Sequence, residues 1–324
     1  MHKQFTESDR AVLAQLLALR IPKQEIAARL MKDRSSIYRE LKRNSGPLGY
    51  LAIEAQQRAE VRRQWPRRPA KLSDPRVREY VERGLQQCWS PDQIAGRSRR
   101  DFPRDGQRQL SRQTIYAWID HSRQRETWRA LLRFGQGRRK RPESSRLPGG
   151  VSIEGRPRVV DQRRRFGDWE GDTIVGRGHR GGLVSLVERK SGYTLLARVD
   201  DRRAATVRHA AQQQCAALPS HLRRTMTFDN GKEFAEHEAL AAATGMNIYF
   251  AQPYCSWQRG TNENTNGLVR QYLPKGTDLT AYSHHEVAAI QNSLNDRPRK
   301  RLSYRTPSEV LTKNAARHGV AFGV

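Results

Sequence analysis

The sequence predicts an α/β domain in the C-terminal half of the chain, preceded by all-α domains. Two segments near the N-terminus, residues 6–43 and 90–119, repeat apolar side chains at helical spacing. From Phe166 onward, short β-rich runs alternate with helical stretches. Between them, residues 135–150 read GQGRRKRPESSRLPGG, a composition typical of a linker. We therefore predict four regions: 1–66, 67–134, a linker over 135–154, and 155–324.

The charge balance indicates a polyanionic partner. The chain has 60 Lys and Arg residues against 33 Asp and Glu, a formal net charge of +27. Residues 1–150 hold 34 of the basic and 16 of the acidic residues, so they carry +18 of the excess. Basic side chains that contact phosphates release condensed counterions, which favours binding to nucleic acid. A solvated basic surface or an acidic membrane surface is the alternative, but no amphipathic anchor or lipidation signal accompanies the charge.

The cysteines argue against a disulfide framework and a thiolate zinc site. Cys88, Cys215 and Cys255 are odd in number, widely spaced and form no CxxC pair. No stretch approaches the ~20 apolar residues of a membrane span. The run AVLAQLLAL follows acidic residues and does not read as a signal peptide. We expect a cytoplasmic protein with neither zinc nor a membrane as partner.

The first helical region has the pattern of a helix-turn-helix unit. Thr6 begins a helix with a capping-box-like pattern, Pro22 permits a new first turn, and Asp33 can cap a third helix. A third helix rich in basic and hydroxyl side chains is typical of a recognition helix in the major groove. The alternative is an ordinary helical bundle with a charged face. We expect DNA contacts from Arg34, Ser35, Arg39, Lys42 and Arg43.

A second unit of the same kind follows. Ser90 combines with Pro91 and Gln93 into an N-cap, a first-turn proline and a third-position glutamine. After a polar loop, Ser111 caps the segment RQTIYAWI, whose apolar residues can pack inward. The exposed start of that helix would present Arg112 and Gln113 to DNA. A plain helical bundle is again the alternative.

The C-terminal region reads as a mixed α/β layer. DWEGDTIVG, GLVSLVERK and YTLLARVD are three successive β-rich runs separated by glycine-containing turns. A helix over 204–218, a strand TMTFD, a helix over 233–243 and a strand NIYFA follow, and helices over 260–273 and 283–295 close the domain. This order matches the ribonuclease-H-like arrangement.

Three carboxylates lie at strand and helix ends of this region. Asp172 lies within the first strand, Asp229 ends the fourth, and Glu263 lies in the first turn of a late helix. Aspartate is unfavourable in a strand centre, and a buried carboxylate must be paired or bind a metal. Three oxygen ligands suit Mg²⁺, and two such ions can activate the attacking oxygen and stabilise the leaving one. We expect two Mg²⁺ ions, with Mn²⁺ as a substitute.

Each acid has another explanation by itself. Asp168 and Glu170 have the same strand parity as Asp172, so alternation does not choose among them. Asp229, in FDNG, could serve turn geometry. Glu263 could complement the dipole at a helix N-terminus.

The chain resembles the insertion-sequence-thirty family of bacterial transposases, which have a DDE triad and an integrase-like fold. The resemblance spans nearly the whole chain. It is carried by WEGDTIVG, HRGGLVSLVERKSGYTLL, FDNGKEFAEH, YFAQPYCSWQRGTNENTNGLVRQYLPKGTD and LNDRPRKRLSYRTPSEVL. Asp229 and Glu263 are separated by 33 residues, as the family pattern implies. The resemblance implies that Asp172, Asp229 and Glu263 are the catalytic and metal-binding triad, and that Arg270 contacts the end of the element.

The resemblance also implies an activity. The helical regions would bind the terminal inverted repeats, and the α/β region would hydrolyse a 3′ end and join it to target DNA. Two ends must be held together, so we expect a homo-oligomer in the DNA complex. A non-catalytic helix-turn-helix regulator and a ribonuclease-H-like nuclease without strand transfer remain the alternatives.

Two smaller features, a histidine and a basic run, have ordinary structural explanations. His237 is expected on a helix surface rather than at the site. The basic run at 297–301 is either a solvated turn or a phosphate-binding strip. The retroviral integrases begin with a His/Cys zinc module, and no such ligand set is visible here.

Overall fold

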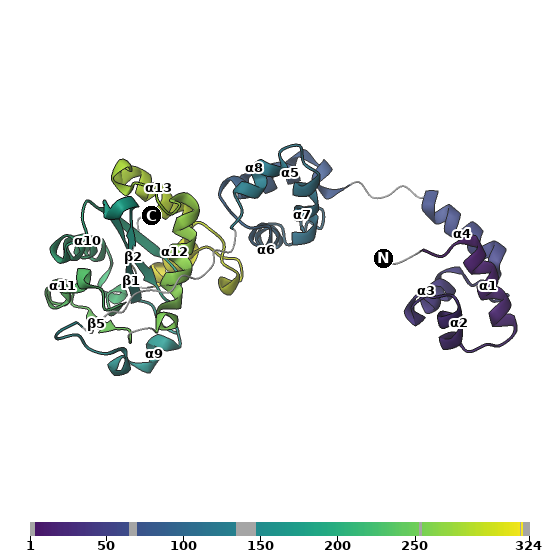
Figure 1. Cartoon of the computed structure of the whole chain (residues 1–324), viewed down its shortest axis with the longest axis horizontal. Coiled ribbons are helices and arrows are strands. Elements are labelled where there is room, and N and C mark those ends of the chain that lie inside the picture. The colour runs from purple at the N-terminus through teal and green to yellow at the C-terminus, as the bar shows by residue number, and fades with distance from the viewer. Residues whose placement is uncertain (1–3, 65–69, 134–146, 253–254, 318, 320–324) are drawn as a thin grey trace. The chain divides into compact units, whose positions relative to one another are not determined.

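A computed structural model describes residues 4–64, 70–133, 147–252, 255–317 and 319. The chain forms two compact units, residues 1–70 and 71–324. Figure 1 shows the helices of the first unit and the helices and sheet of the second. Part of the expected linker, residues 134–146, lies outside the described residues. The division at 66, 134 and 154 stays a prediction.

The first unit is a bundle of four helices. They are α1 (Glu7–Ala18), α2 (Lys23–Arg29), α3 (Arg34–Asn44) and α4 (Ala52–Gln64). The capping box expected at Thr6 is present, whereas Asp33 stands at the start of α3 without a side-chain capping bond. Leu13, Ile26 and Ile37 are fully buried between the helices. Arg10 and Glu40 form a buried ion pair at 2.7 Å, so a polar pair lies beside this small apolar core.

The second unit begins with four more helices. They are α5 (Pro75–Gln86), α6 (Pro91–Asp101), α7 (Arg112–His121) and α8 (Arg125–Ala130). The capping box at Ser90 and Gln93 and the N-cap at Ser111 form as expected. Val81, Ile94 and Ile115 are fully buried in the core of this region.

A five-stranded sheet forms the centre of the α/β region. Its strands are β1 (Asp168–Val175), β2 (Gly182–Glu188), β3 (Thr194–Val199), β4 (Thr225–Phe228) and β5 (Asn247–Phe250). The order is β3-β2-β1-β4-β5. The first three strands pair antiparallel, and β1, β4 and β5 pair parallel. This mixed sheet confirms the predicted ribonuclease-H-like fold class.

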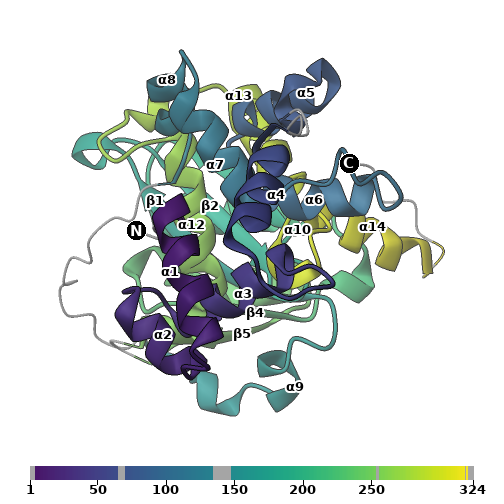
Figure 2. The ribbon, with the colours of Figure 1, turned by 90° about the vertical axis from the view of Figure 1, so that its right-hand side faces the viewer.

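Helices cover both faces of the sheet. The helices α10 (Ala204–Ala216) and α11 (His237–Thr244) cover one face, while α12 (Gly260–Tyr272) and α13 (His284–Asn295) cover the other (Figure 1). Figure 2 shows α12 alongside β1 and β2. The short α9 (Arg158–Asp161) and the terminal α14 (Pro307–Arg317) complete the helices.

Both edges of the sheet are occupied by other parts of the chain. At β3, the Asn295 side chain accepts from Thr194 N and donates to Thr194 O, both at 2.8 Å. Gln291 accepts from Leu196 N at 2.8 Å on the same edge. At β5, Phe250 N donates to Val151 O at 2.8 Å. Backbone groups at both outer strands are therefore already bonded.

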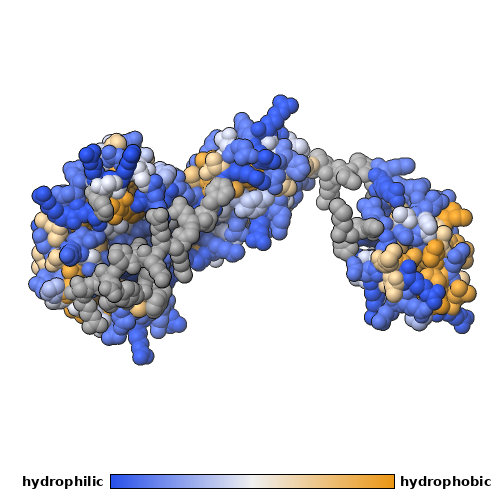
Figure 3. All heavy atoms as spheres, viewed as in Figure 1, coloured by the Kyte–Doolittle hydropathy of each residue, from blue (hydrophilic) through white to orange (hydrophobic). Residues whose placement is uncertain are grey.

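The surface is mostly hydrophilic in the view of Figure 3. Most of the large hydrophobic side chains that are exposed in the described ranges belong to the first unit, among them Leu19, Met31 and Ile53. In the part of the chain that the structure describes, no helix is both long and apolar enough to cross a membrane.

Candidate active site

The parallel pairing of β1 and β4 brings two of the expected acids to one edge of the sheet. Glu170 is opposite Thr227 in the register, and two residues further along come Asp172, within β1, and Asp229, just after β4. Asp172 is 8% exposed, and the Asp229 side chain is one third exposed. The carboxyl ends of parallel neighbours meet, which places both carboxylates on the same side of the site.

One guanidinium joins these two carboxylates. Arg259, 4% exposed, precedes α12. Its Nη2 donates to Asp229 Oδ2 at 3.0 Å, and its Nη1 lies 3.7 Å from Asp172 Oδ2. Nη1 also donates to Gly171 O at 3.1 Å. The two aspartates are therefore close enough to share one cation.

The helix α12 is fixed against β1 by side-chain amides. Asn266 Nδ2 donates to Asp172 Oδ2 at 2.8 Å, and Asn266 Oδ1 accepts from Ser185 Oγ at 3.0 Å. One turn earlier, Asn262 N donates to Glu170 Oε2 at 2.8 Å, and Asn262 Nδ2 donates to Glu170 O at 3.2 Å. These bonds hold α12 and orient the Asp172 carboxylate.

Glu263 projects from the same helix into a groove. It is exposed and lies three residues before Asn266, which is one helical turn on the same face. Both residues line a groove of about 730 Å³ together with Thr173 at the end of β1. Within the described residues, no three His, Cys, Asp or Glu side chains gather closely enough to hold a metal ion. Glu263 therefore faces the site from α12 without joining the aspartates as a preformed ligand set.

The groove has basic walls. Arg133, Arg270 and Lys275 line it together with Glu263 and Thr173. Arg133 Nη1 donates to Asn264 Oδ1 at 3.0 Å, which connects the end of the helical region to α12. A groove with basic side chains beside carboxylates suits a phosphodiester backbone.

Arg270 lies on the groove face of α12, two turns after Glu263. Its Nη2 donates to Val175 O at 2.9 Å at the end of β1. Burial lowers the pKa of this guanidinium from its ordinary value. The Arg270 side chain is half-buried, bonded to the protein backbone, and also lines the groove.

The two other acids of β1 have structural partners. Asp168 accepts from Arg165 Nε at 2.9 Å and from Thr225 Oγ1 at 2.8 Å. Glu170 is fully buried and pairs with Arg189 at 2.6 Å. Both are therefore occupied inside the fold, whereas Asp172 lies within β1 directly before Thr173, which lines the groove.

The expected DNA-reading side chains are exposed in both helical regions. On α3, Ser35 and Arg39 contact each other, because Arg39 Nη2 donates to Ser35 Oγ at 3.1 Å. On α7, Arg112 and Gln113 lie at the exposed first turn. The remaining exposed residues of this set on α3 are Arg34, Lys42 and Arg43.

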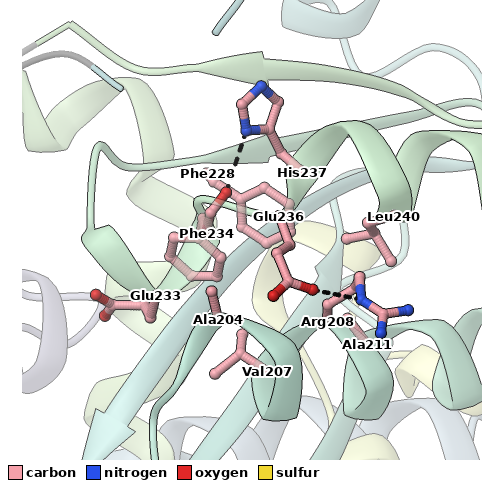
Figure 4. A pocket seen from close by; sticks show the side chains of 10 residues that line it. All are labelled: Ala204, Val207, Arg208, Ala211, Phe228, Glu233, Phe234, Glu236, His237 and Leu240. Carbon is pink, nitrogen blue, oxygen red and sulfur yellow. Dashed lines mark hydrogen bonds and ion pairs between the residues drawn. The ribbon is translucent and has the colours of Figure 1, made fainter. Parts of the chain in front are cut away.

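The surface position expected for His237 is wrong. His237 is 7% exposed, stands edge-on to Phe250, and its Nδ1 lies 3.2 Å from Phe234 O. It borders a cleft between α10 and α11, where Arg208 also pairs with Glu236 (Figure 4). The cleft holds about 10 Å³, which is room for about one water molecule. This cleft lies between helices of the sheet face opposite α12, and Glu233 at its border also accepts from Thr173 Oγ1 at 2.8 Å.

In the basic run at 297–301, Arg297 belongs neither to a solvated turn nor to an exposed phosphate-binding strip. This residue is 2% exposed and donates to Gln93 Oε1 at 3.0 Å and to Gln271 Oε1 at 2.7 Å. Burial lowers the pKa of the Arg299 guanidinium to about 9. Arg301 donates to Lys190 O at 2.7 Å. These arginines fasten helices and loops to one another.

Three residues near the site were not identified from the sequence. Arg259 precedes a helix in a segment without periodicity, and no local pattern indicates its two carboxylate partners. The partners of Asn266, Asp172 and Ser185, are 94 and 81 residues earlier in the chain and come together only in the fold. Glu233 accepts from Thr173 Oγ1 at 2.8 Å and adds a fourth acid beside Asp229. It follows Asp229 within FDNGKEF, so its place in that string was the available signal.

Known proteins similar to this chain include several transposases, although no family model matches it. It is 38% identical, over 99% of each chain, to the transposase for insertion sequence element IS4351 of Bacteroides fragilis. It is 36% identical, over 96% of this chain and 84% of the relative, to transposase InsI for insertion sequence element IS30A of Escherichia coli K12. It is 42% identical to the transposase for insertion sequence element IS1086 of Cupriavidus metallidurans, over 89% of this chain and 88% of the relative.

A solved structure is also similar to part of the chain. The catalytic core domain of BIV integrase is 19% identical, with a TM-score of 0.37, over 47% of this chain and 98% of that one. The three transposases match over 89–99% of this chain at 36–42% identity. Identity at this level over nearly the whole chain confirms the family resemblance that the sequence strings indicated: the chain belongs to the insertion-sequence-thirty family of bacterial transposases.

Proposed function

We propose that this transposase cleaves the 3′ ends of its element and joins them to target DNA, with Asp172, Asp229 and Glu263 as the catalytic triad. The observation that supports this most is the shared contact of Asp172 and Asp229 with one buried guanidinium. The acids converge from neighbouring parallel strands, and α12 carries Glu263 along the adjoining groove. Asp168 and Glu170 are already paired elsewhere.

The residues present fit a divalent cation of the Mg²⁺ or Mn²⁺ type. Carboxylate oxygens are the ligands these ions prefer. A guanidinium between Asp172 and Asp229 shows that the pair accommodates positive charge. Asp172 and Asp229 would hold the cation, and Glu263 would reach it by a change of its exposed side chain. When bound, two such ions activate the attacking oxygen and stabilise the leaving oxygen.

The remaining residues of the site would bind DNA and orient the catalytic carboxylates. Asn266 fixes the direction of the Asp172 carboxylate through its amide. Arg133, Arg270 and Lys275 would attract the phosphates of a strand lying in the groove. The freed 3′ hydroxyl is the nucleophile of the joining step, so no covalent bond between protein and DNA is required.

The exposed basic faces of α3 and α7 would bind the terminal inverted repeats. We propose that Arg34, Ser35, Arg39, Arg112 and Gln113 contact bases near the N-terminal ends of these helices. Lys42 and Arg43 lie in the last turn of α3 and would contact phosphates. Two element ends must be held for joining, so the working complex would be a homo-oligomer.

One assay tests the catalytic proposal. The protein is incubated with labelled element ends, a target plasmid and Mg²⁺, and bound, nicked and joined DNA are separated. Asp172→Asn, Asp229→Asn and Glu263→Gln should each abolish nicking and joining while end binding persists. Asp200→Asn is the matched control, because the Asp200 side chain is 82% exposed. Normal joining by any triad variant would remove that residue from the triad.

The same assay separates the alternatives. Binding without nicking by the wild-type chain would favour a regulator, and nicking without joining would favour a nuclease. Arg39→Ala and Arg112→Ala should each weaken footprints on the element ends. An unchanged footprint for either would exclude that helix from end recognition.

A further inference from the structure

The positively charged Arg259 side chain occupies the place between two aspartates that are expected to bind a metal cation. Its guanidinium contacts both expected metal-binding aspartates and is itself buried. Its Nε is buried and has no hydrogen-bond partner among the described residues. The side chain is therefore held chiefly by the two carboxylates and by Gly171 O.

We propose that Arg259 is the resident counter-ion of the aspartate pair, and that a divalent cation displaces its guanidinium from Asp229 on entering the site. This inference rests on the proposed function, because it takes Asp172 and Asp229 as the metal-binding pair. It assigns Arg259 a positioning role, in which the side chain sets the affinity of the site for metal.

The charges explain why the two cations compete. Asp172 and Asp229 carry two negative charges near one point, and like charges so placed repel each other unless a cation lies between them. Arg259 neutralises one of these charges in the metal-free protein. A divalent cation that approaches the same oxygens is repelled by the guanidinium. Its attraction to the two aspartates is also weaker, because the guanidinium already compensates half of their charge.

The contacts indicate which bond gives way. Asp172 is buried, and its oxygens also accept from Thr173 N at 2.9 Å and Asn266 Nδ2 at 2.8 Å. Asp229 is one third exposed, and its Oδ2 accepts from Arg259 at 3.0 Å. Water and ions reach Asp229 more easily, so the bond to Asp229 is the one expected to open. The bond from Arg259 to Gly171 O can persist while this happens.

Competition of this kind would protect the site in the absence of metal. The two carboxylates would keep a partner, and β1 would keep its connection to the segment that precedes α12. Metal entry would then exchange one cation for another rather than fill a site of unpaired acids.

Metal affinity tests the inference directly. Mn²⁺ binding to the full chain is measured by electron paramagnetic resonance of the free ion for wild type, Arg259→Met and Arg259→Lys. Methionine keeps an unbranched apolar chain without the charge, and we expect it to tighten Mn²⁺ binding at least ~10-fold, about 1.4 kcal/mol. Lysine keeps the charge, and we expect the Mn²⁺ affinity of Arg259→Lys to lie within ~3-fold of the wild-type value. Unchanged or weaker Mn²⁺ binding by Arg259→Met, with native circular dichroism, would overturn the inference.

Two further measurements guard against a folding defect and a wrong site. The double variant Arg259→Met with Asp229→Asn should lose the gained affinity, and a gain that survives would place the ion elsewhere and overturn the inference. Should Arg259→Met fail to fold, a structure of the wild-type chain with Mn²⁺ decides. We expect the contact to Asp229 to be broken and the one to Gly171 O to remain; an intact 3.0 Å contact beside the bound ion would overturn the inference. Failure of the proposed function would show instead as missing DNA joining by wild type, whatever the metal affinity.

Discussion

Gly171 provides a test of how tightly the strand that carries Asp172 is packed. A Cβ atom at this position would lie 2.2 Å from Phe228 Cε1 and 2.6 Å from its Cδ1. Phe228 is fully buried and stacks on Phe234 with ring centroids 4.1 Å apart, so the ring has little room to move. Forcing an extra methyl group into a packed core costs about 1–3 kcal/mol. Gly171→Ala should destabilise the α/β region by that amount.

Thermal unfolding measures the effect. A loss of this size lowers the melting temperature of a region of this length by roughly 2–12 °C. Gly106→Ala is the matched control, because no heavy atom lies within 4 Å of the added Cβ. Gly171 precedes Asp172 and its O accepts from Arg259, so a backbone shift that relieves the clash would displace both, and the variant should lose DNA joining even below its melting temperature. A Gly171→Ala chain that melts with wild type and joins DNA normally would refute the packing argument.

Two further predictions concern single polar groups. Asn266→Ala removes the amide that donates to Asp172 at 2.8 Å. A hydrogen bond to a charged group contributes ~1.5–3 kcal/mol, so DNA joining should slow roughly 10- to 150-fold. An unchanged joining rate at normal end binding would contradict the orienting role of Asn266. Burial raises the pKa of Glu188 above its ordinary 4.5, so the folded chain favours the protonated carboxyl. The contribution of the protonated Glu188 to stability is complete below the pKa of this group in the unfolded chain. It is lost as the pH rises through the higher pKa of the group in the folded chain. Urea unfolding should therefore show a fall in stability with pH that Glu188→Gln removes, and parallel pH curves for the two chains would argue against it.

The strands and the main helices of the α/β region were predictable because their patterns are local. The runs that form β1, β2 and β3 are β-rich and are separated by glycine-containing turns. The caps at Ser90 and Ser111 marked two helix starts correctly. The helix α4 was missed because its sequence, AIEAQQRAEVRRQ, has only a narrow apolar face. The helix α5 was missed although Asp74 caps it and Pro75 occupies its first turn, a signal that was available.

The site was predictable only in part, because its selection depends on contacts between distant segments. Parity in β1 left Asp168, Glu170 and Asp172 equivalent. The difference between them is tertiary: Arg165 and Arg189 neutralise the first two. The partners of Arg259 are 87 and 30 residues earlier in the chain, at Asp172 and Asp229, so no spacing rule relates them.

The contacts at the outer strands of the sheet oppose its extension by another chain. An open outer strand invites another chain to continue the ladder, which leads to aggregation. Here the amide of Asn295 imitates a neighbouring strand at Thr194, and the segment at Val151 does the same at Phe250. Another chain that extended the sheet at Thr194, Leu196 or Phe250 would therefore have to displace a bond that the protein already makes there.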